Sequence, residues 1–275
     1  MLILYNMDVY EKVKKFYESA NAEKRIIGKS LFGRNLYAVK LGCGAPVGIV
    51  QYAIHGREFI TAELAFIHFK RGLFQGSAWL LPLVNPDGAL LSERGLDSVK
   101  NVETKKRLLH WNGGTDFSLW KANGRGVDLN VNFPARWGEG AKNVCVAGSE
   151  NFIGEQPFSE PETLALKSFT EEIRPDYTVS YHTKGEEIYW YFHQPDPKRD
   201  LFLAEILSRS TGYKIAYAAG SVGGYKDWCI EKFSIPSFTI EAGREKFTHP
   251  LQGEALNDVV RCNRNALYDL TKGFL

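Results

Sequence analysis

The stretch VGIVQYAIHGRE, residues 47–58, is nearly continuous in apolar side chains up to Ile54 and then turns polar. A short apolar run of this kind is typical of a strand that is buried on both faces, as in a parallel sheet between two helical layers. Apolar side chains suited to a buried helix follow over Glu58–Arg71. The stretch therefore predicts a buried strand, a polar turn and a helix.

The same alternation of apolar strands and amphipathic helices continues along the chain. We expect further strands at Arg25–Ser30, Leu36–Leu41, Ala78–Val84, Asp176–His182 and within Ser234–Glu241. We expect helices after the cap Asp8, from the capping box Ser159–Glu162 to Ile173, over Leu201–Ser210, and from Leu256 to Leu270. This order predicts an α/β fold, an α/β/α sandwich around a mixed, mostly parallel sheet. With neither repeats nor a linker, one domain over residues 1–275 is the simplest organisation.

The composition narrows the class of protein. The chain has 275 residues, 44% of them apolar and 24% charged, which excludes a disordered or fibrous chain. A net charge of +2 argues against nucleic-acid or membrane partners. The four cysteines form no Cys-x-x-Cys pair, and Asp8 comes too early for a signal peptide. We expect a cytoplasmic protein.

Two long polar, glycine-bearing stretches, at about residues 92–127 and 135–158, predict neither helix nor strand. Loops of this length in a compact domain are usually functional. We expect them to lie over one edge of the sheet and to wall a cleft.

Candidate metal ligands stand where predicted strands end. His55 and Glu58 follow one buried strand, and His182 ends another. A catalytic zinc takes three protein ligands and leaves one position open, so these three residues form a suitable set. A third strand ends at Glu241, where partial burial would raise the carboxyl pKa towards that of a general base. Each residue alone also fits a plainer role, a helix-capping histidine or a solvated glutamate.

Five motifs follow one another along the chain: HGRE at 55–58, NPDG at 85–88, GVDLN at 126–130, His182 and Glu241. Each motif alone is a weak indication of a family, but their order and long spacing together are specific. Together they resemble zinc carboxypeptidases of the carboxypeptidase A-like type, from about residue 24 to the end. The resemblance implies one zinc ion per chain on His55, Glu58 and His182. It also implies that Glu241 is the general base for a zinc-activated water and then the acid.

Other residues take roles from the same resemblance. Asp128 would orient the first imidazole from behind. Arg57 and Asn130 would contact substrate. Lys121 stands where the digestive enzymes carry the arginine that polarises the scissile carbonyl, and it keeps the charge but not the planar guanidinium.

The chain departs from the family pattern at two positions. The arginine that clamps the substrate's terminal carboxylate is replaced by Val131, which cannot bind a carboxylate. The tyrosine that closes over the substrate would fall on Ala219, with Tyr217 slightly out of register. Arg57, Arg136 and Arg244 are the alternative clamps between which the sequence does not choose.

The run YHTKGEEIYW, residues 181–190, resembles the bacterial γ-D-glutamyl-diamino acid peptidases within this family. It implies hydrolysis of a γ-D-glutamyl-diamino acid bond in cell-wall peptides. Lys184 with Glu186 or Glu187 would read the extra charged groups of such a substrate. The plainer interpretation of these charges is a solvated turn.

Three other functions stay open. They are a general metallocarboxypeptidase, a deacylase of small N-acyl amino acids, and a non-catalytic zinc-binding module. The module is the least favoured, because a pure binder has no need of the base Glu241. The sequence does not predict an oligomeric state.

Overall fold

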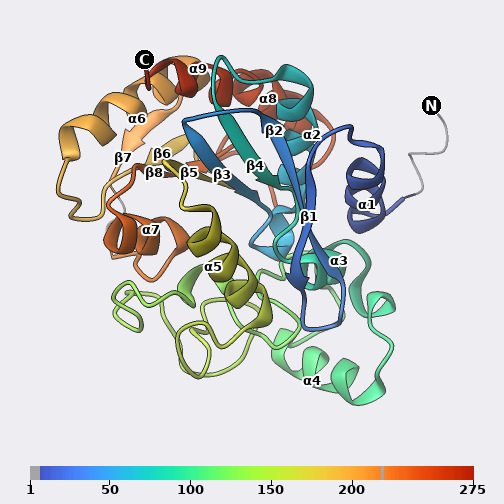
Figure 1. The fold of residues 1–275 in the computed structure, drawn as a ribbon. Coiled ribbons are helices and arrows are strands. Elements are labelled where there is room, and N and C mark those ends of the chain that lie inside the picture. Colours follow the sequence, from blue (N-terminus) through green and yellow to red (C-terminus); the bar gives the residue numbers. More distant parts are fainter. Residues whose placement is uncertain (1–6, 218–219) are drawn as a thin grey trace.

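The computed structural model describes residues 7–217 and 220–275, and in them a mixed sheet lies at the centre of the molecule (Figure 1). Eight strands follow the order β1-β2-β4-β3-β5-β8-β6-β7. The strands are β1 (Lys24–Lys29), β2 (Asn35–Gly42), β3 (Val47–Tyr52), β4 (Ser77–Leu81), β5 (Tyr177–His182), β6 (Glu187–Tyr189), β7 (Lys214–Ala216) and β8 (Ser237–Glu241). The central block β4-β3-β5-β8 is entirely parallel.

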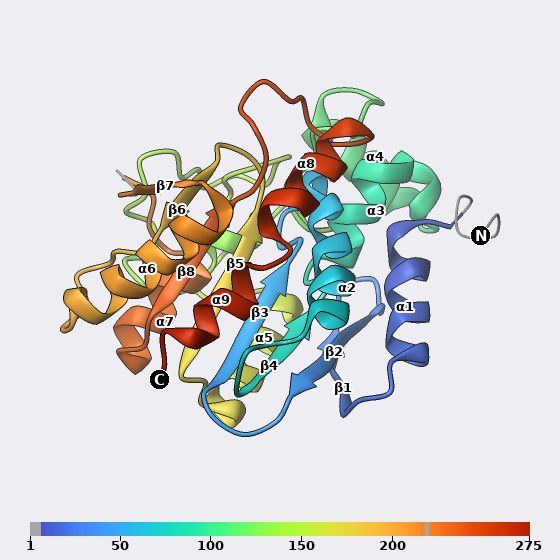
Figure 2. The ribbon, with the colours of Figure 1, turned by 90° about the horizontal axis from the view of Figure 1, so that it is seen from above.

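Helices cover both faces of this sheet. One face carries α5 (Pro161–Ile173) and α7 (Tyr225–Phe233). The other carries α2 (Ala62–Arg71), α6 (Pro197–Thr211), α8 (Glu254–Asn263) and α9 (Ala266–Lys272), seen in front of the sheet in Figure 2. The remaining helices are α1 (Val9–Ser19), α3 (Pro86–Arg94) and α4 (Val102–Asn112). The predicted α/β/α sandwich with a mixed, mostly parallel sheet is therefore confirmed.

Strand β3 shows why the apolar run decides this fold. Ile49 packs in the core under α5 and α7, whereas its neighbour Val50 packs in the core under α2 and α6. Both side chains are fully buried. Successive side chains of a strand point to opposite faces, so a strand between two helical layers must be apolar on both. Each such burial contributes roughly 1.5–3 kcal/mol to stability.

Several predicted boundaries are wrong. The helix expected from Glu58 begins as a separate 3₁₀ helix, Gly56–Thr61, because Glu58 itself is not helical (φ −100°, ψ 19°). The capping box at 159–162 does not form: Glu160 is the N-cap without a side-chain cap, and its carboxylate accepts from Ser159 instead. The last helix is two helices, α8 and α9.

Some elements were not predicted at all. Helix α4 lies inside the unassigned stretch 92–127, and α3 begins in the predicted NPDG turn. Helix α7 and the short strands β6 and β7 were also missed. The stretch 135–158 contains neither helix nor strand, apart from a single bridge between Val144 and Phe152.

All four cysteines lie in the described part of the chain and are free thiols. None of the described helices is both long and apolar enough to cross a membrane. The cytoplasmic location expected from the sequence stays a prediction.

Asn85 connects three segments of the chain by side-chain hydrogen bonds. Its Oδ1 accepts from the Gly88 N–H at 2.8 Å and so caps α3. Its Nδ2 donates to the carbonyls of Ile54 (3.1 Å) and Ala122 (3.2 Å). This fully buried amide therefore holds the end of β3 against the loop around residue 122.

We predict that Asn85→Ala lowers the free energy of unfolding by about 3 kcal/mol, because a helix cap is lost and two buried carbonyls lose a donor. The matched control is Asn101→Ala, which removes the exposed N-cap of α4. That variant should lose about 1 kcal/mol. Urea unfolding measures both values, and equal losses would contradict the joining role of Asn85.

Candidate active site

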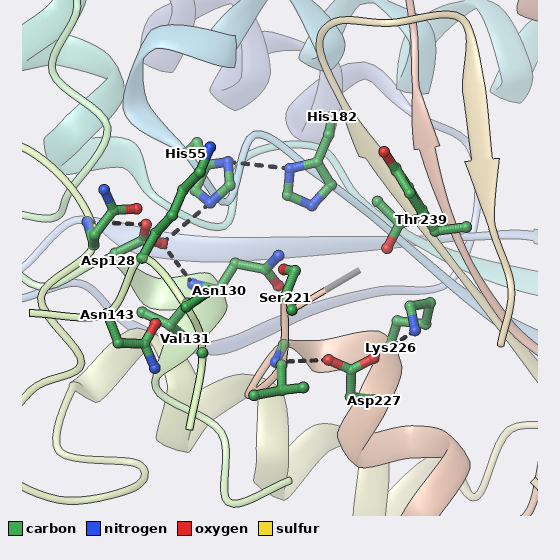
Figure 3. Close-up of a pocket in the computed structure, with 18 of the residues that line it drawn as sticks. His55, Asp128, Asn130, Val131, Asn143, His182, Ser221, Lys226, Asp227 and Thr239 are labelled. Atoms are coloured by element: carbon green, nitrogen blue, oxygen red, sulfur yellow. Dashed lines mark hydrogen bonds and ion pairs between the residues drawn. The ribbon is translucent and has the colours of Figure 1, made fainter. Parts of the chain in front are cut away.

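The site forms where three parallel strands end at the same edge of the sheet. His182 is the last residue of β5 and pairs in register with Glu241, the last residue of β8. His55 follows the end of the neighbouring strand β3 and caps the 3₁₀ helix that carries Glu58. Figure 3 shows His55 and His182 facing each other across this edge. Carboxyl ends of parallel strands are the usual location of sites in open α/β sheets.

Three ligand-type atoms converge there. His55 Nδ1 lies 2.9 Å from Glu58 Oε1, and His182 Nδ1 lies 3.0 Å from Glu58 Oε2. The two Nδ1 atoms are 3.1 Å apart. All three side chains are buried. Two imidazole Nδ1 atoms this close to each other and to a carboxylate are poorly satisfied by one another but suit a shared cation. This donor set fits zinc, with His55, Glu58 and His182 as the residues that would hold it.

Asp128 fixes the orientation of the His55 ring. His55 Nε2 donates to Asp128 Oδ1 at 3.1 Å, which leaves Nδ1 free for the cation. Lys121 Nζ lies 2.7 Å from the other carboxylate oxygen. Burial would raise the pKa of Asp128, but Lys121 and His55 outweigh it and hold the pKa well below its usual range. Asp128 is therefore a buried anion that fixes both Lys121 and His55.

The turn that carries His55 is pressed against the loop that carries Lys121. The Gly56 N–H donates to the Lys121 carbonyl at 2.9 Å. A Cβ at Gly56 would lie 2.5 Å from the Gly88 carbonyl oxygen and 2.7 Å from that of Trp120, so only glycine fits. This close approach sets the position of Lys121 relative to the metal ligands.

Glu241 ends β8 beside His182. Burial raises its pKa to about 7, and the His182 imidazole acts in the opposite direction. A carboxyl group with such a pKa changes its protonation near neutral pH, as an acid/base catalyst must. The pKa shift expected from the sequence is thus present in the structure.

A cavity of about 370 Å³ opens in front of these residues. Residues 140–143 form one wall of the cavity. They belong to the stretch 135–158, which was expected to border a cleft. The other lining residues are His55, Lys121, Asp128, Asn130, Val131, Asn151, His182, Tyr189, Gly220, Ser221, Val222, Gly224, Lys226, Asp227, Thr239 and Glu241.

Four predicted substrate-reading residues do not line this cavity. Arg57 donates to Glu150 and to the Leu119 carbonyl. Lys184 pairs with Glu245.

Glu187 lies beside the cavity without lining it, because it pairs in register with Glu241 and shares its face of the sheet. The N–H groups of Gly185 and Glu186 donate to the carbonyls of Gly243 and Glu241, so this segment is bound along β8. Glu187 instead accepts a hydrogen bond from Tyr189, whose ring does line the cavity. The substrate-reading role expected for this run stays a prediction.

The alternative carboxylate clamps also lie elsewhere. Arg136 pairs with Glu139, and Arg244 pairs with Asp258. Ala219 lies outside the described residues. Tyr217 is 64% exposed and packs against Trp190 and Tyr191, with ring centroids 5.7 Å apart in each case.

Sequence reasoning missed Tyr189, Lys226, Asp227 and Thr239 as cavity residues. One signal was present: Ser237, Thr239 and Glu241 alternate with apolar residues in a strand expected to be buried on both faces. Polar side chains on one face of such a strand indicate that this face meets something other than an apolar core.

These features are typical of the active site of a metal-dependent hydrolase at the edge of a parallel sheet. More narrowly, the zinc carboxypeptidase family model matches residues 10–266, and the chain belongs to this family. It is 34% identical over 245 residues to the γ-D-glutamyl-L-diamino acid endopeptidase 1 of Lysinibacillus sphaericus, over 82% of this chain and 61% of that protein's length. The chain thus spans less than two thirds of that relative.

Two other similarities agree with this family. Murein peptide amidase A of Escherichia coli is 32% identical over 123 residues, which cover 40% of this chain and 47% of that protein. The solved structure of bovine thrombin-activatable fibrinolysis inhibitor, bound to a tick carboxypeptidase inhibitor, has the same fold. It superposes with a TM-score of 0.76 at 19% identity and covers 97% of this chain and 96% of that chain.

We predict about one zinc ion per chain in wild-type protein and almost none in His182→Ala after dialysis, because one of three ligands is lost. Elemental analysis measures the content. His110→Ala, which removes an exposed histidine of α4, is the control and should keep its zinc. Full zinc occupancy in His182→Ala would contradict the assigned ligand set.

Proposed function

We propose that this protein is a zinc-dependent peptidase that hydrolyses a γ-D-glutamyl-diamino acid bond in cell-wall peptides. The observation that carries the proposal is Val131. It lines the cavity at the position of the family's carboxylate clamp, and none of the three alternative arginines lines the cavity. The printed names of the relatives from Lysinibacillus and Escherichia, which refer to a γ-D-glutamyl-diamino acid bond and to murein peptides, support the same substrate class.

The chemistry follows from the position of each group. A zinc ion bound by the three ligands supplies Lewis acidity to the scissile carbonyl and to an attacking water. Glu241 faces the ligands from β8, takes a proton from the attacking water and returns it to the leaving amine. Lys121 lines the cavity beside Asp128 and offers positive charge to the carbonyl oxygen as negative charge develops on it.

The absence of a guanidinium at position 131 selects against ordinary C-terminal residues. Arginine binds a carboxylate through two parallel N–H···O bonds, and an isopropyl group offers none. A peptide whose recognition depends on its terminal α-carboxylate therefore loses its main contact. A γ-glutamyl peptide brings other charged groups on both sides of the scissile bond, and the polar wall of the cavity has partners for them.

Glu241 is the proposed general base, and its role can be tested by substitution. Glu241→Gln should keep its zinc yet turn over about 100-fold or more slowly, because the amide cannot accept the proton. Glu231→Gln removes an exposed carboxylate of α7 and is the control. Metal analysis and steady-state kinetics on one preparation separate the two effects. Near wild-type turnover in Glu241→Gln would remove Glu241 from the mechanism.

The proposed substrate class can be tested by comparing two kinds of peptide. L-Ala-γ-D-Glu-diaminopimelate should be hydrolysed about 100-fold more efficiently than a hippuryl-type α-peptide. Both end in an α-carboxylate that Val131 cannot bind, but only the former brings further charged groups that replace the missing bidentate contact. Val131→Arg should raise kcat/KM for the α-peptide. A clear preference of the wild type for α-peptides would leave a general carboxypeptidase. Hydrolysis of simple N-acyl amino acids alone would leave a deacylase.

A further inference from the structure

A second cluster of charged side chains lies outside the cavity, where the N-terminal end of α5 meets the turn between β1 and β2. The carboxylates of Asp87, Glu160 and Glu162 are each at most 1% exposed, and none of them lines the cavity. Asp87 belongs to the NPDG motif, and the two glutamates belong to the predicted capping box that does not form. The mechanism proposed above uses none of the three.

Cations balance only two of these carboxylates. The Arg34 guanidinium donates to Asp87 Oδ1 at 2.6 Å. Arg125 Nη1 lies 3.5 Å from Glu160 Oε1. Glu162 has no such partner among the described residues, although it is as deeply buried as the other two. A buried carboxylate without a cation is costly when ionised, so Glu162 favours its neutral form.

The hydrogen bonds and the pKa of Glu162 agree with a neutral carboxyl group. Its described donors are both uncharged, the Leu31 N–H at 2.9 Å and the Asn123 side chain at 3.3 Å. Burial, and after it the negative charge of Asp87, raise the pKa of Glu162 to about 8. The titratable or charged groups on the elements packed around Glu162 are Asp87, Glu160, Arg34, Arg125 and Tyr37.

Asn123 lies between the two glutamates and the loop to which it belongs. Its Nδ2 donates to Glu160 Oε2 at 2.7 Å and to Glu162 Oε2 at 3.3 Å. Its Oδ1 accepts from the backbone N–H groups of Arg125 (2.9 Å) and Val127 (3.1 Å). A side-chain amide has two N–H groups and two acceptor lone pairs, so this buried amide is fully used.

The loop held by Asn123 carries two groups of the active site. The Asn123 N–H also donates to the Val127 carbonyl at 2.8 Å, which closes the loop a second time. Lys121 stands two residues before Asn123, and Asp128 directly follows Val127. Lys121 and Asp128 form an ion pair of 2.7 Å, and both line the cavity. A shift of Asn123 would therefore move both partners of this pair.

We propose that Glu162 is a positioning residue for Lys121 and that it must be uncharged to act as one. The inference rests on the proposed function, in which Lys121 offers positive charge to the scissile carbonyl. Neutral Glu162 fits beside Asp87 and Glu160 without a counter-ion. Ionised Glu162 adds a third negative charge that no cation of its own balances, so it draws in water and the loop that Asn123 holds against it opens.

The raised pKa makes this positioning sensitive to alkaline pH. The pKa of Glu162 rises from an ordinary value of 4.5 to about 8 in the folded chain. The folded chain therefore keeps a proton that the unfolded chain releases. This contribution to stability is fully present below pH 4.5 and is lost as the pH rises through about 8. One pH unit higher, the neutral form is about tenfold less populated than the ionised form.

The direct test is the pH dependence of kcat in the wild type and in Glu162→Gln, whose amide stays neutral. On whichever peptide the protein hydrolyses, kcat of the variant relative to the wild type should rise about tenfold between pH 7 and pH 9, because only the wild type ionises at this position. The ratio cancels alkaline effects of groups that both proteins share. A ratio that does not change with pH, in folded and zinc-containing Glu162→Gln, overturns the proposal.

The matched control is Glu172→Gln, which removes an exposed carboxylate from the same helix. Its kcat relative to the wild type should be the same at pH 7 and pH 9. A rise equal to that of Glu162→Gln would overturn the assignment to Glu162. A wild type that hydrolyses no peptide would overturn the proposed function, and the role of Glu162 would then be decided by the measurement that follows.

Hydrogen exchange of the wild-type protein needs neither a variant nor a substrate. The Arg125 and Val127 N–H groups donate to Asn123, so their protection factors, corrected for the intrinsic rate at each pH, should fall about tenfold between pH 7 and pH 9. Amides in the middle of α6 should keep their protection. Unchanged protection of Arg125 and Val127 would overturn the role of Glu162, even if Glu162→Gln fails to fold.

Discussion

The register between two parallel strands is the constraint on which the site depends. His182 and Glu241 are paired at the ends of β5 and β8, so a metal ligand and the candidate base lie side by side without any loop to position them. The remaining ligands come from a turn after β3, which is less rigid by nature. Gly56 holds that turn by close backbone packing, and Asn85 holds it by a side-chain hydrogen bond to the Ile54 carbonyl. A precise site thus combines ligands on rigid strands with one closely packed turn.

The charges of the site are arranged mostly in neutralising pairs. Lys121 lies on Asp128, and Lys226 lies on Asp227. Buried charges are tolerated only when they are paired and hydrogen-bonded, which explains why each cation has its own carboxylate. Glu241 departs from this arrangement: burial dominates over its neighbours, and its pKa rises to about 7. The same desolvation that costs stability makes this carboxyl group suitable for proton transfer at neutral pH.

The residues that line the cavity differ from those that the family pattern predicts. Val131 leaves the usual clamp position apolar, and the charged side chains of the run at 184–187 are not among the lining residues. The polar contribution passes to Thr239, Tyr189 and the first turn of α7.

The sequence by itself determined the architecture and the chemical class of the site. Apolar runs such as Val47–Ile54 predict buried strands because a strand between two helical layers has no solvent-facing side, and ligand-type residues at strand ends predict a metal site at one edge. Only the tertiary structure decided which charged residues face the cavity. Nothing in the local sequence distinguishes Lys184 from Lys226 as a cavity residue. Lys184 nevertheless pairs with Glu245 outside the cavity, whereas Lys226 lines it. The physical reason is that these orientations depend on hydrogen bonds to segments distant along the chain, such as that of Lys226 to Tyr191, which local patterns do not encode.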